Sequence, residues 1–289
     1  MKKTIQYIIL AALVTILFAC QNNEQDIPET ETEEQEDINN DDNHNQSEED
    51  IDQEVSVGDE EDESEEEVDE PSQTVDVEYE INPVSWSVDP LTEEVNEEVV
   101  LLTIDDAPDG NALKMAEDLA ELDAKAIFFV NGHFLQTEEE QEILRQIHEL
   151  GFAIGNHTYT HPNLNDLSEE EQRDEIVGLN DLVEEIIDER PVFFRAPFGA
   201  NTDMSHQLAE EEGMVVMNWT YGYDWEAEYR DKEALADIMV NSPYLRNGAN
   251  LLMHDRDWTA EALPDIVIGL REKGYEIIDP LAIKIPNQS

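Results

Sequence analysis

The sequence predicts an α/β fold in which a parallel sheet of seven strands forms an incomplete barrel. From about Val99 onward, short runs of apolar residues recur, and longer segments with helical periodicity separate them. Each run is continuously apolar rather than alternating, as is typical of parallel strands covered on both faces. Strands that alternate with helices indicate an α/β architecture, and the number of runs and the size of this region suit a barrel.

Two kinds of local pattern define the expected elements. Two of the connecting amphipathic helices begin with a capping box, in which the residue before the helix and a residue three positions later satisfy each other's backbone N–H: Thr137 with Glu140, and Ser168 with Glu171. Residues 81–97 precede the first strand, and we expect them to cover one end of the barrel. The apolar runs place the strands at 98–104, 125–130, 152–156, 192–195, 214–219, 249–253 and 275–278.

The N-terminus has the organisation of a secretory signal. Two lysines precede an apolar run from Tyr7 to Phe18, which has the length of a signal-peptide core and is short for a membrane span. The run ends in Leu-Phe-Ala-Cys, and Cys20 is the only cysteine of the chain, so no disulfide can form within it. This ending resembles the lipobox of bacterial lipoproteins. The resemblance implies a lipoprotein signal peptide at 1–19, lipidation at Cys20, and an extracytoplasmic protein anchored to the cell membrane.

Residues 20–80 have the composition of a disordered acidic tether. From Gln21 to Glu80 there are 28 Asp and Glu residues, no Lys or Arg, and few apolar residues. Such a segment cannot bury enough surface to offset its chain entropy, and its like charges extend it. It would let a head domain at 81–289 reach from the membrane into the surrounding wall polymer. An acidic tail without a positional role is the alternative.

The head domain is acidic in its own right. Of the 73 acidic and 15 basic residues in the chain, 45 and 13 fall within 81–289, which gives this region a net charge of −32. Because such a charge repels nucleic acids and anionic lipids, we expect no nucleic-acid partner, membrane contact only through the lipid anchor, and a monomer. The acidity serves either solubility or adaptation to high salt. The second hypothesis predicts lower stability in dilute buffer than in molar salt.

Polar side chains with catalytic chemistry follow the ends of five predicted strands. Asp105 and Asp106 follow the first strand, and His157 and His161 follow the third. Because the carboxyl ends of parallel strands lie on one face of a barrel, we expect all these residues to converge. The fourth, fifth and sixth strands lead to Arg195, to Trp219, Asp224 and Trp225, and to His254.

The paired carboxylates indicate a metal ion. Two adjacent carboxylates repel each other unless a positive charge lies beside them, and a divalent cation supplies that charge. The neutral imidazoles of His157 and His161 with one carboxylate make three ligands, which leaves positions open for water and substrate as in catalytic metal sites. The other carboxylate can then transfer a proton.

Five segments occur in order through this region: TIDDAP (103–108), HTYTH (157–161), RAPFG (195–199), WTYGYDW (219–225) and LMH (252–254). They resemble the motifs of the polysaccharide deacetylase family, the NodB-like homology domain of carbohydrate esterase family four. The resemblance covers about residues 99–280. It implies a distorted seven-stranded (β/α) barrel and a polysaccharide deacetylase that acts on linear amides.

The resemblance also implies roles for the matched polar residues. Asp105 would be the general base that deprotonates water, and the positive charge of Arg195 would keep it ionised. Asp224 would orient Arg195, and His254 would be the general acid that protonates the leaving group. Zinc, or another divalent metal such as cobalt, would be held by Asp106, His157 and His161.

Three further matched residues would contact the substrate. Leu252 would line the slot for the acetyl methyl group, Trp225 would wall the pocket, and a backbone N–H near Phe198 would stabilise the oxyanion. The sequence departs from the common motifs at Ala107, in place of a glycine, and at Gly222, where an acidic residue is frequent in a segment that is one residue longer.

We therefore predict a metal-dependent hydrolase that removes acetyl groups from an extracellular polysaccharide. The N-acetyl groups of peptidoglycan amino sugars are favoured because the tether begins at a cell membrane. The alternatives are a deacetylase of acetylxylan or chitooligosaccharides, a hydrolase of a small amide on the same fold, and a non-catalytic lipoprotein that binds glycan. The presence of Asp105 favours a deacetylase, and the altered WTYGYDW segment favours binding alone.

Overall fold

The computed structural model describes residues 75–286 of the 289-residue chain. The predicted signal peptide, the lipidation site Cys20 and the tether as far as residue 74 lie outside the described residues. The predictions made for them stay predictions.

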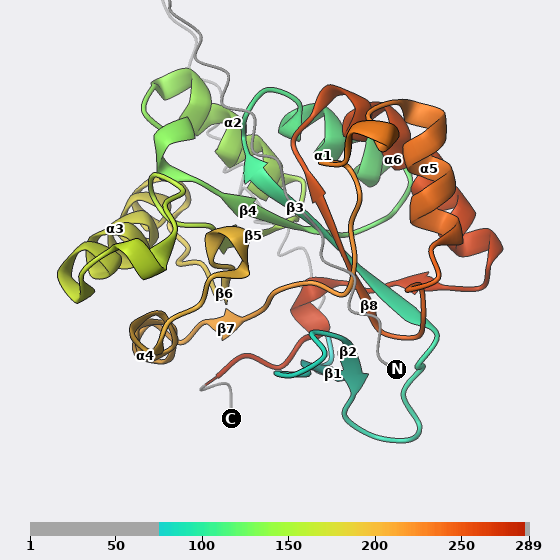
Figure 1. Cartoon of the computed structure of the whole chain (residues 1–289), viewed down its shortest axis with the longest axis horizontal. Coiled ribbons are helices and arrows are strands. Elements are labelled where there is room, and N and C mark those ends of the chain that lie inside the picture. The colour runs from blue at the N-terminus through green and yellow to red at the C-terminus, as the bar shows by residue number, and fades with distance from the viewer. Residues whose placement is uncertain (1–74, 287–289) are drawn as a thin grey trace, which may run out of the picture. The chain divides into compact units, whose positions relative to one another are not determined.

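The centre of the fold is a seven-stranded parallel sheet, as predicted (Figure 1). All seven predicted strands are present in the predicted order, with bounds that differ only at their ends. Hydrogen-bonded neighbours follow the order β7-β6-β5-β4-β3-β8, and β9 pairs with the start of β3. The strands are β3 (Val99–Ala107), β4 (Ile127–Val130), β5 (Ala153–Asn156), β6 (Phe193–Phe194), β7 (Val215–Val216), β8 (Ala249–His254) and β9 (Glu276–Ile277).

The chain segment that follows β7 joins the two outer strands of the sheet. Tyr221 forms an isolated parallel bridge with Leu251 of β8, and the N–H of Leu252 donates to the Tyr221 carbonyl at 2.9 Å. The N–H of Thr220 donates to the carbonyl of Asn250 at the same distance. These irregular contacts curl the sheet into a distorted barrel, which confirms the predicted fold class.

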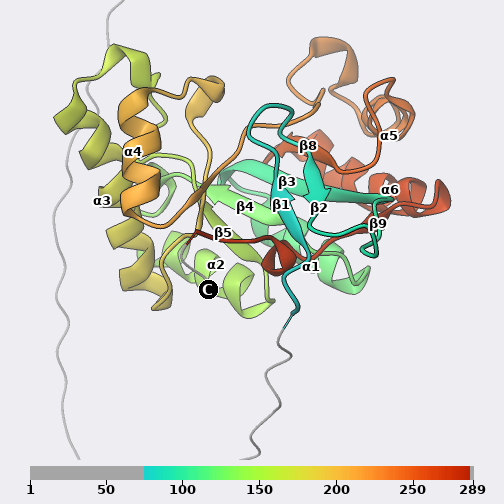
Figure 2. The same cartoon turned by 90° about the horizontal axis from the view of Figure 1, so that it is seen from below.

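Six α-helices in the described part of the chain connect the strands, and their apolar faces pack against the outside of the sheet (Figures 1 and 2). Both predicted capping boxes are present, Thr137 with Glu140 and Ser168 with Glu171. Five short 3-10 helices occupy connecting loops, at 132–134, 164–166, 197–199, 227–229 and 280–282. The helices are α1 (Ala112–Glu121), α2 (Glu138–Glu149), α3 (Glu169–Ile187), α4 (Asp203–Glu211), α5 (Lys232–Asn241) and α6 (Asp257–Glu272).

The two faces of β3 serve two different cores, because successive side chains of a strand point to opposite sides. Val100, Leu102 and Ile104 pack with the helices in the larger core. Val99 and Leu101 belong to a second core, which lies inside the barrel together with Ile127, Phe129, Phe193 and Met217. The inward-facing alternation leads along β3 directly to the site.

A short antiparallel hairpin covers the amino ends of the strands, as expected for residues 81–97 (Figures 1 and 2). Its strands are β1 (Tyr79–Ile81) and β2 (Val88–Pro90), and it contributes to the inner core. The predicted tether boundary at residue 80 is wrong by a short margin, because the hairpin begins at Tyr79, whose ring is buried in the inner core. The N–H of Val88 donates to the carbonyl of Gly248 at 2.8 Å. A side chain at Gly248 would place its Cβ 2.2 Å from the Val88 oxygen, so the close approach requires glycine.

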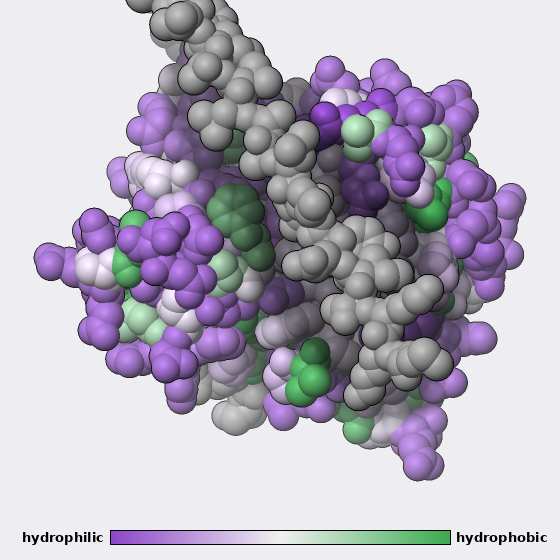
Figure 3. Space-filling view, viewed as in Figure 1, coloured by the Kyte–Doolittle hydropathy of each residue, from purple (hydrophilic) through white to green (hydrophobic). Residues whose placement is uncertain are grey.

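The visible surface is predominantly hydrophilic, in keeping with the acidic composition (Figure 3). Within residues 75–286, no helix combines the length and the apolar character that a membrane crossing requires.

The buried carboxylate of Asp255 fixes the loop that links β3 to α1. It accepts hydrogen bonds from four consecutive backbone N–H groups, those of residues 109–112, at 2.6 to 3.0 Å. Burial raises the pKa of Asp255, and the hydrogen bonds from the backbone oppose that shift. Because Asp255 directly follows β8, it ties the end of that strand to the loop after the paired aspartates.

We expect the Asp255→Ala change to lower the free energy of unfolding by roughly 2–5 kcal/mol, because it removes the shared acceptor of four backbone N–H groups, one of them buried and the others partly buried in this contact. Urea unfolding followed by circular dichroism measures this loss. Asp257→Ala is the matched control, since Asp257 is exposed in the same segment. Equal losses in the two variants would contradict the assigned role.

Candidate functional site

A cavity of about 670 Å³ lies at the carboxyl ends of the parallel strands. Nine of the ten site residues predicted within 75–286 line this cavity. The tenth, Arg195, is fully buried and reaches the site from below through Asp105. The predicted convergence of strand-end residues is therefore present in the structure.

The two adjacent carboxylates reach the same cavity because β3 is irregular at its end. Asp105 continues the inward-facing alternation of the strand. The pairing register between β3 and β4 shifts between Ile104 and Ala107, and Asp106 has a positive φ of 60°. A bulge of this kind redirects a side chain, so Asp106 also faces the cavity instead of the opposite side of the sheet.

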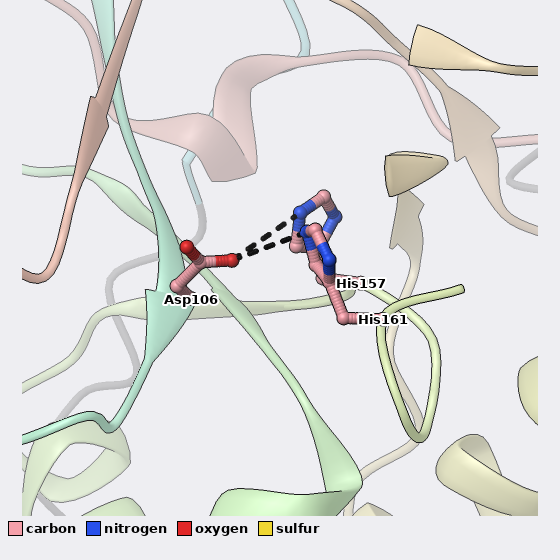
Figure 4. A group of neighbouring side chains, drawn as sticks. All are labelled: Asp106, His157 and His161. Carbon is pink, nitrogen blue, oxygen red and sulfur yellow. Dashed lines mark ion pairs between the residues drawn. The ribbon is translucent and has the colours of Figure 1, made fainter. Parts of the chain in front are cut away.

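Asp106, His157 and His161 form a group whose ligand atoms could hold one metal ion (Figure 4). Oδ1 of Asp106 lies 3.4 Å from Nε2 of His161 and 3.8 Å from Nε2 of His157. Ligands that bind one zinc ion tetrahedrally at ordinary bond lengths lie about 3.4 Å apart. The three side chains therefore fit a metal ion in both atom type and spacing.

Hydrogen bonding orients the His157 ring for this task. Its Nδ1 lies 2.7 Å from the carbonyl of Arg195, so Nδ1 carries the proton and donates, and Nε2 keeps its lone pair for a ligand. Burial lowers the pKa of His157, against the opposing effect of the Asp105 and Asp106 charges, which keeps the ring neutral. The side-chain amide of Asn131 supports the loop by donating to the His157 carbonyl at 2.6 Å.

The loop that carries the two histidines has an unusual backbone. Thr158 and His161 both have positive φ, at 70° and 59°, which is a strained conformation for residues other than glycine. The N–H of Thr160 donates to the Glu175 carboxylate at 2.7 Å, and this contact to α3 helps to hold the loop. This backbone conformation brings the rings of His157 and His161 beside Asp106.

Arg195 is held by a dense set of contacts beneath the cavity. Its Nη1 donates to Oδ1 of Asp105 at 2.6 Å and to the hydroxyl of Thr103 at 2.8 Å, and its guanidinium lies over the Phe129 ring. Burial lowers the pKa of Arg195, and the Asp105 carboxylate opposes that effect. Asp105 is therefore paired with a cation at one oxygen. Its Oδ2 lies 3.5 Å from Nε2 of His157, beside the metal ligands.

The predicted partner of Asp224 is wrong. We expected Asp224 to orient Arg195, but its Oδ1 lies 2.8 Å from Nδ1 of His254 and its Oδ2 accepts from the His254 backbone N–H at 2.6 Å. Thr259 also donates to Oδ2. The two side chains lie in different places. Arg195 lies inside the barrel between Asp105 and the carbonyl of Asn218, whereas the loop after β7 brings Asp224 against β8. Asp224 therefore orients the imidazole of His254.

The charge of Asp224 also alters the titration of His254. Burial acts to lower the pKa of His254, but the hydrogen bond to Asp224 and the charges of Asp224, Asp105 and Asp106 outweigh it, so the pKa is raised. A cation bound at Asp106 would offset the contribution of that carboxylate and leave the effect of Asp224.

Aromatic side chains flank the two histidine groups, and Trp225 lines the cavity that it was expected to wall. The exposed Phe198 ring stands edge-to-face on His161 at 4.9 Å between centroids. The planes of the Trp225 and His254 rings form an angle of 87°, and their centroids lie 5.6 Å apart. Leu252 is buried in the floor between them.

The glycine that replaces a frequent acidic residue has a packing reason. A Cβ at Gly222 would lie 2.3 Å from the backbone oxygen of Leu252 and 2.8 Å from the Trp225 ring. The shorter segment therefore runs directly against β8, and it needs glycine to do so.

Sequence analysis missed three residues that line the cavity. Arg256 donates to Oδ2 of Asp106 and to Asp109, each at 2.8 Å. Trp258 donates from Nε1 to the Asp224 carbonyl at 2.8 Å, and the guanidinium of Arg230 lies 5.6 Å from the Trp258 ring. Arg256 and Trp258 follow His254 closely in the chain, so their position just after a strand end could have predicted that they line the cavity.

Residues 92–246 match the family model described as polysaccharide deacetylase, which is more than half of the chain. The chain belongs to the polysaccharide deacetylase family. This confirms the predicted family of enzymes, and residues from all five ordered motifs line one cavity.

Two relatives are named as peptidoglycan deacetylases. A peptidoglycan-N-acetylglucosamine deacetylase of Bacillus cereus is 29% identical over 63% of this chain and 67% of its own length. The peptidoglycan-N-acetylmuramic acid deacetylase PdaC of Bacillus subtilis is 31% identical over 68% of this chain, which spans only 40% of PdaC. A solved structure of PdaC has a TM-score of 0.57, with 64% of this chain covered and 89% of that chain.

A second similar structure shows what family membership leaves open. It is a pseudoenzyme of carbohydrate esterase family four from Bacillus anthracis, 31% identical to this chain with a TM-score of 0.57, and 63% of each chain is covered. The fold therefore does not by itself decide turnover, and the side chains of the site carry that argument.

Proposed function

We propose that this protein is a metal-dependent deacetylase that hydrolyses the N-acetyl groups of peptidoglycan amino sugars. The observation that carries the proposal is the arrangement of three functional groups around one cavity. These are a carboxylate paired with a buried arginine, an imidazole held by a carboxylate, and an Asp/His/His ligand set. Together they supply a base, an acid and a metal site for hydrolysis of an amide.

Asp106, His157 and His161 are the residues that would hold the ion. Zinc suits two imidazoles and a carboxylate, and cobalt is a substitute of similar preference. When bound, zinc polarises the acetyl carbonyl and makes a nearby water more acidic.

The Asp105 carboxylate is the general base. Oδ1 is occupied by Arg195, whereas Oδ2 faces the metal ligands and is free to take a proton from the attacking water. The fixed guanidinium keeps the carboxylate charged and prevents it from rotating. A backbone N–H near Phe198 would donate to the acetyl oxygen, which gains negative charge when water adds to the carbonyl carbon.

His254 is the general acid. Its Nδ1–H donates to Asp224, so the proton that reaches the leaving amine comes from Nε2 of the protonated ring. The raised pKa of His254 increases the share of molecules that carry this proton at a given pH. Leu252 and Trp225 bound the space between the acid and the metal ligands, where the acetyl group and the sugar would lie.

Two considerations support peptidoglycan as the substrate. The relatives from Bacillus cereus and Bacillus subtilis are named as peptidoglycan deacetylases. The N-terminal sequence resembles that of a lipoprotein with a lipidation site at Cys20 and an acidic tether after it, and such an anchor would hold the enzyme beside the wall on the outer side of the cell membrane.

The test is acetate release from a panel of acetylated polymers by the full chain loaded with zinc. We expect release from peptidoglycan to exceed that from chitooligosaccharides and from acetylxylan. Release that is greatest from acetylxylan or chitooligosaccharides would show that this polymer, and not peptidoglycan, is the preferred substrate. No release from any polymer by the loaded protein would contradict the proposed activity and leave glycan binding as the function.

We expect Asp224→Asn to move the alkaline limb of the pH profile to lower pH. The acid must be protonated, so activity falls as pH rises through the pKa of His254, which the Asp224 charge raises. Removal of that charge lowers the pKa and brings the fall closer to neutrality. The profile of kcat/KM against pH measures the shift. An unchanged alkaline limb would show that His254 is not the titrating acid.

A further inference from the structure

Arg230 presents an uncompensated positive charge to the site cavity. It follows the 3-10 helix at 227–229 and is one of the side chains that line the cavity. Among residues 75–286, no carboxylate lies within 4.0 Å of its guanidinium. Five other Lys and Arg residues of 75–286 also lack such a partner, but none of them lines the cavity: Lys125, Arg246, Arg271, Lys273 and Lys284.

The other two arginines at the site have their charge balanced. Arg195 is paired with Asp105 beneath the cavity. Arg256 is paired with Asp106 and with Asp109 at the rim. Of the three arginines at the site, Arg230 is therefore the one whose charge is available to a negatively charged group of the substrate.

The guanidinium of Arg230 is nevertheless held in place by two tryptophans. Its Nη2 donates to the carbonyl of Trp225 at 2.8 Å, and its central carbon lies 5.6 Å from the centroid of the Trp258 ring. An arginine has five N–H donors, and these two contacts use only one of them. A positioned guanidinium with free donors is well suited to bind a carboxylate.

We propose that Arg230 is a specificity-determining residue that binds a carboxylate carried by the glycan next to the acetylated sugar. This inference rests on the proposed deacetylase function and adds the chemical class of the substrate. An acidic protein repels an anionic polymer, so a local cation is what allows such a polymer to bind productively. The carboxylate belongs either to an acidic amino sugar itself or to a peptide attached to it.

The experiment compares two glycan strands of equal length that differ only in their carboxyl groups. One is a peptide-free strand of acetylated amino sugars in which every second sugar carries a carboxylate. The other is the same strand with its carboxyl groups reduced to alcohols. Both kcat/KM for acetate release and the binding affinity from calorimetry are measured with the full, zinc-loaded chain, and a strand that retains its peptides distinguishes the two sources of carboxylate.

We expect the wild type to prefer the carboxylate strand by about 3- to 10-fold, with the preference shrinking as salt rises. Arg230→Gln should abolish the preference, and Arg230→Lys should keep part of it. Arg246→Gln, which removes an exposed arginine outside the cavity, should retain the full preference. A preference seen only with the peptide-bearing strand would assign the carboxylate to the peptide.

A wild-type preference that survives in Arg230→Gln, or no preference for either carboxylate source, would overturn the inference. Absence of acetate release from every strand would instead contradict the proposed function. Calorimetric binding of the same strands would then still decide whether Arg230 recognises the carboxylate.

Discussion

Asp105→Asn is expected to lower kcat for acetate release by about 10²- to 10⁴-fold, the range that a general base contributes. Asparagine has nearly the same shape and can still accept the hydrogen bond from Arg195, but it cannot take a proton from water. Because Oδ1 of Asp105 is held by Arg195, the loss concerns the free Oδ2 beside the metal ligands. Single-turnover measurement of acetate release at saturating substrate reports this step.

Two controls separate the loss of the base from other effects of Asp105→Asn. The change leaves the buried Arg195 without its carboxylate partner, so the free energy of unfolding should fall and must be measured beside activity. Zinc content should stay close to one ion per chain, since Asp105 is not one of the three ligands. Activity close to that of the wild type in a folded, zinc-loaded variant would remove Asp105 from the mechanism.

His157→Ala is expected to weaken zinc binding by more than about 100-fold and to abolish acetate release at micromolar zinc. Loss of a partner that merely orients a ligand typically costs 10- to 100-fold in affinity, and His157 is itself one of the three ligands. The ring also donates to the Arg195 carbonyl, so the change removes a contact between the loop and the residue that follows β6. Competition with a fluorescent chelator measures the dissociation constant directly.

His161→Ala should show a similar loss of zinc affinity with a smaller effect on stability, because His161 is less buried than His157. His206→Ala is the control, since this exposed histidine lies on α4 outside the site cavity. It should bind zinc as the wild type does. Unchanged zinc affinity in both ligand variants would move the metal site elsewhere.

Much of the fold was predictable because its strands are buried on both faces. Short continuous runs rich in β-branched residues, such as VVLLTI, favour strands buried on both faces, and such strands are typical of parallel sheets. The short strands β6 and β7 were overestimated in length. Their pairing ends where Arg195 and the following loops turn toward the cavity.

The site was predictable where function depends on the position of a residue at a strand end. Asp105, His157 and His254 lie there, and the topology alone brings them together. The partner of Asp224 was not predictable, because it depends on how the loop after β7 folds against β8. The same holds for Arg230, whose place is set by contacts with two tryptophans.

The measurement that tests the account most directly is acetate release from peptidoglycan as zinc is returned to the chelator-treated full chain. We predict that chelation abolishes release and that activity rises with added zinc and saturates at one ion per chain, in line with the single Asp106, His157 and His161 group found within residues 75–286. Release that persists after complete removal of metal, or fully loaded protein that releases no acetate, would contradict the account.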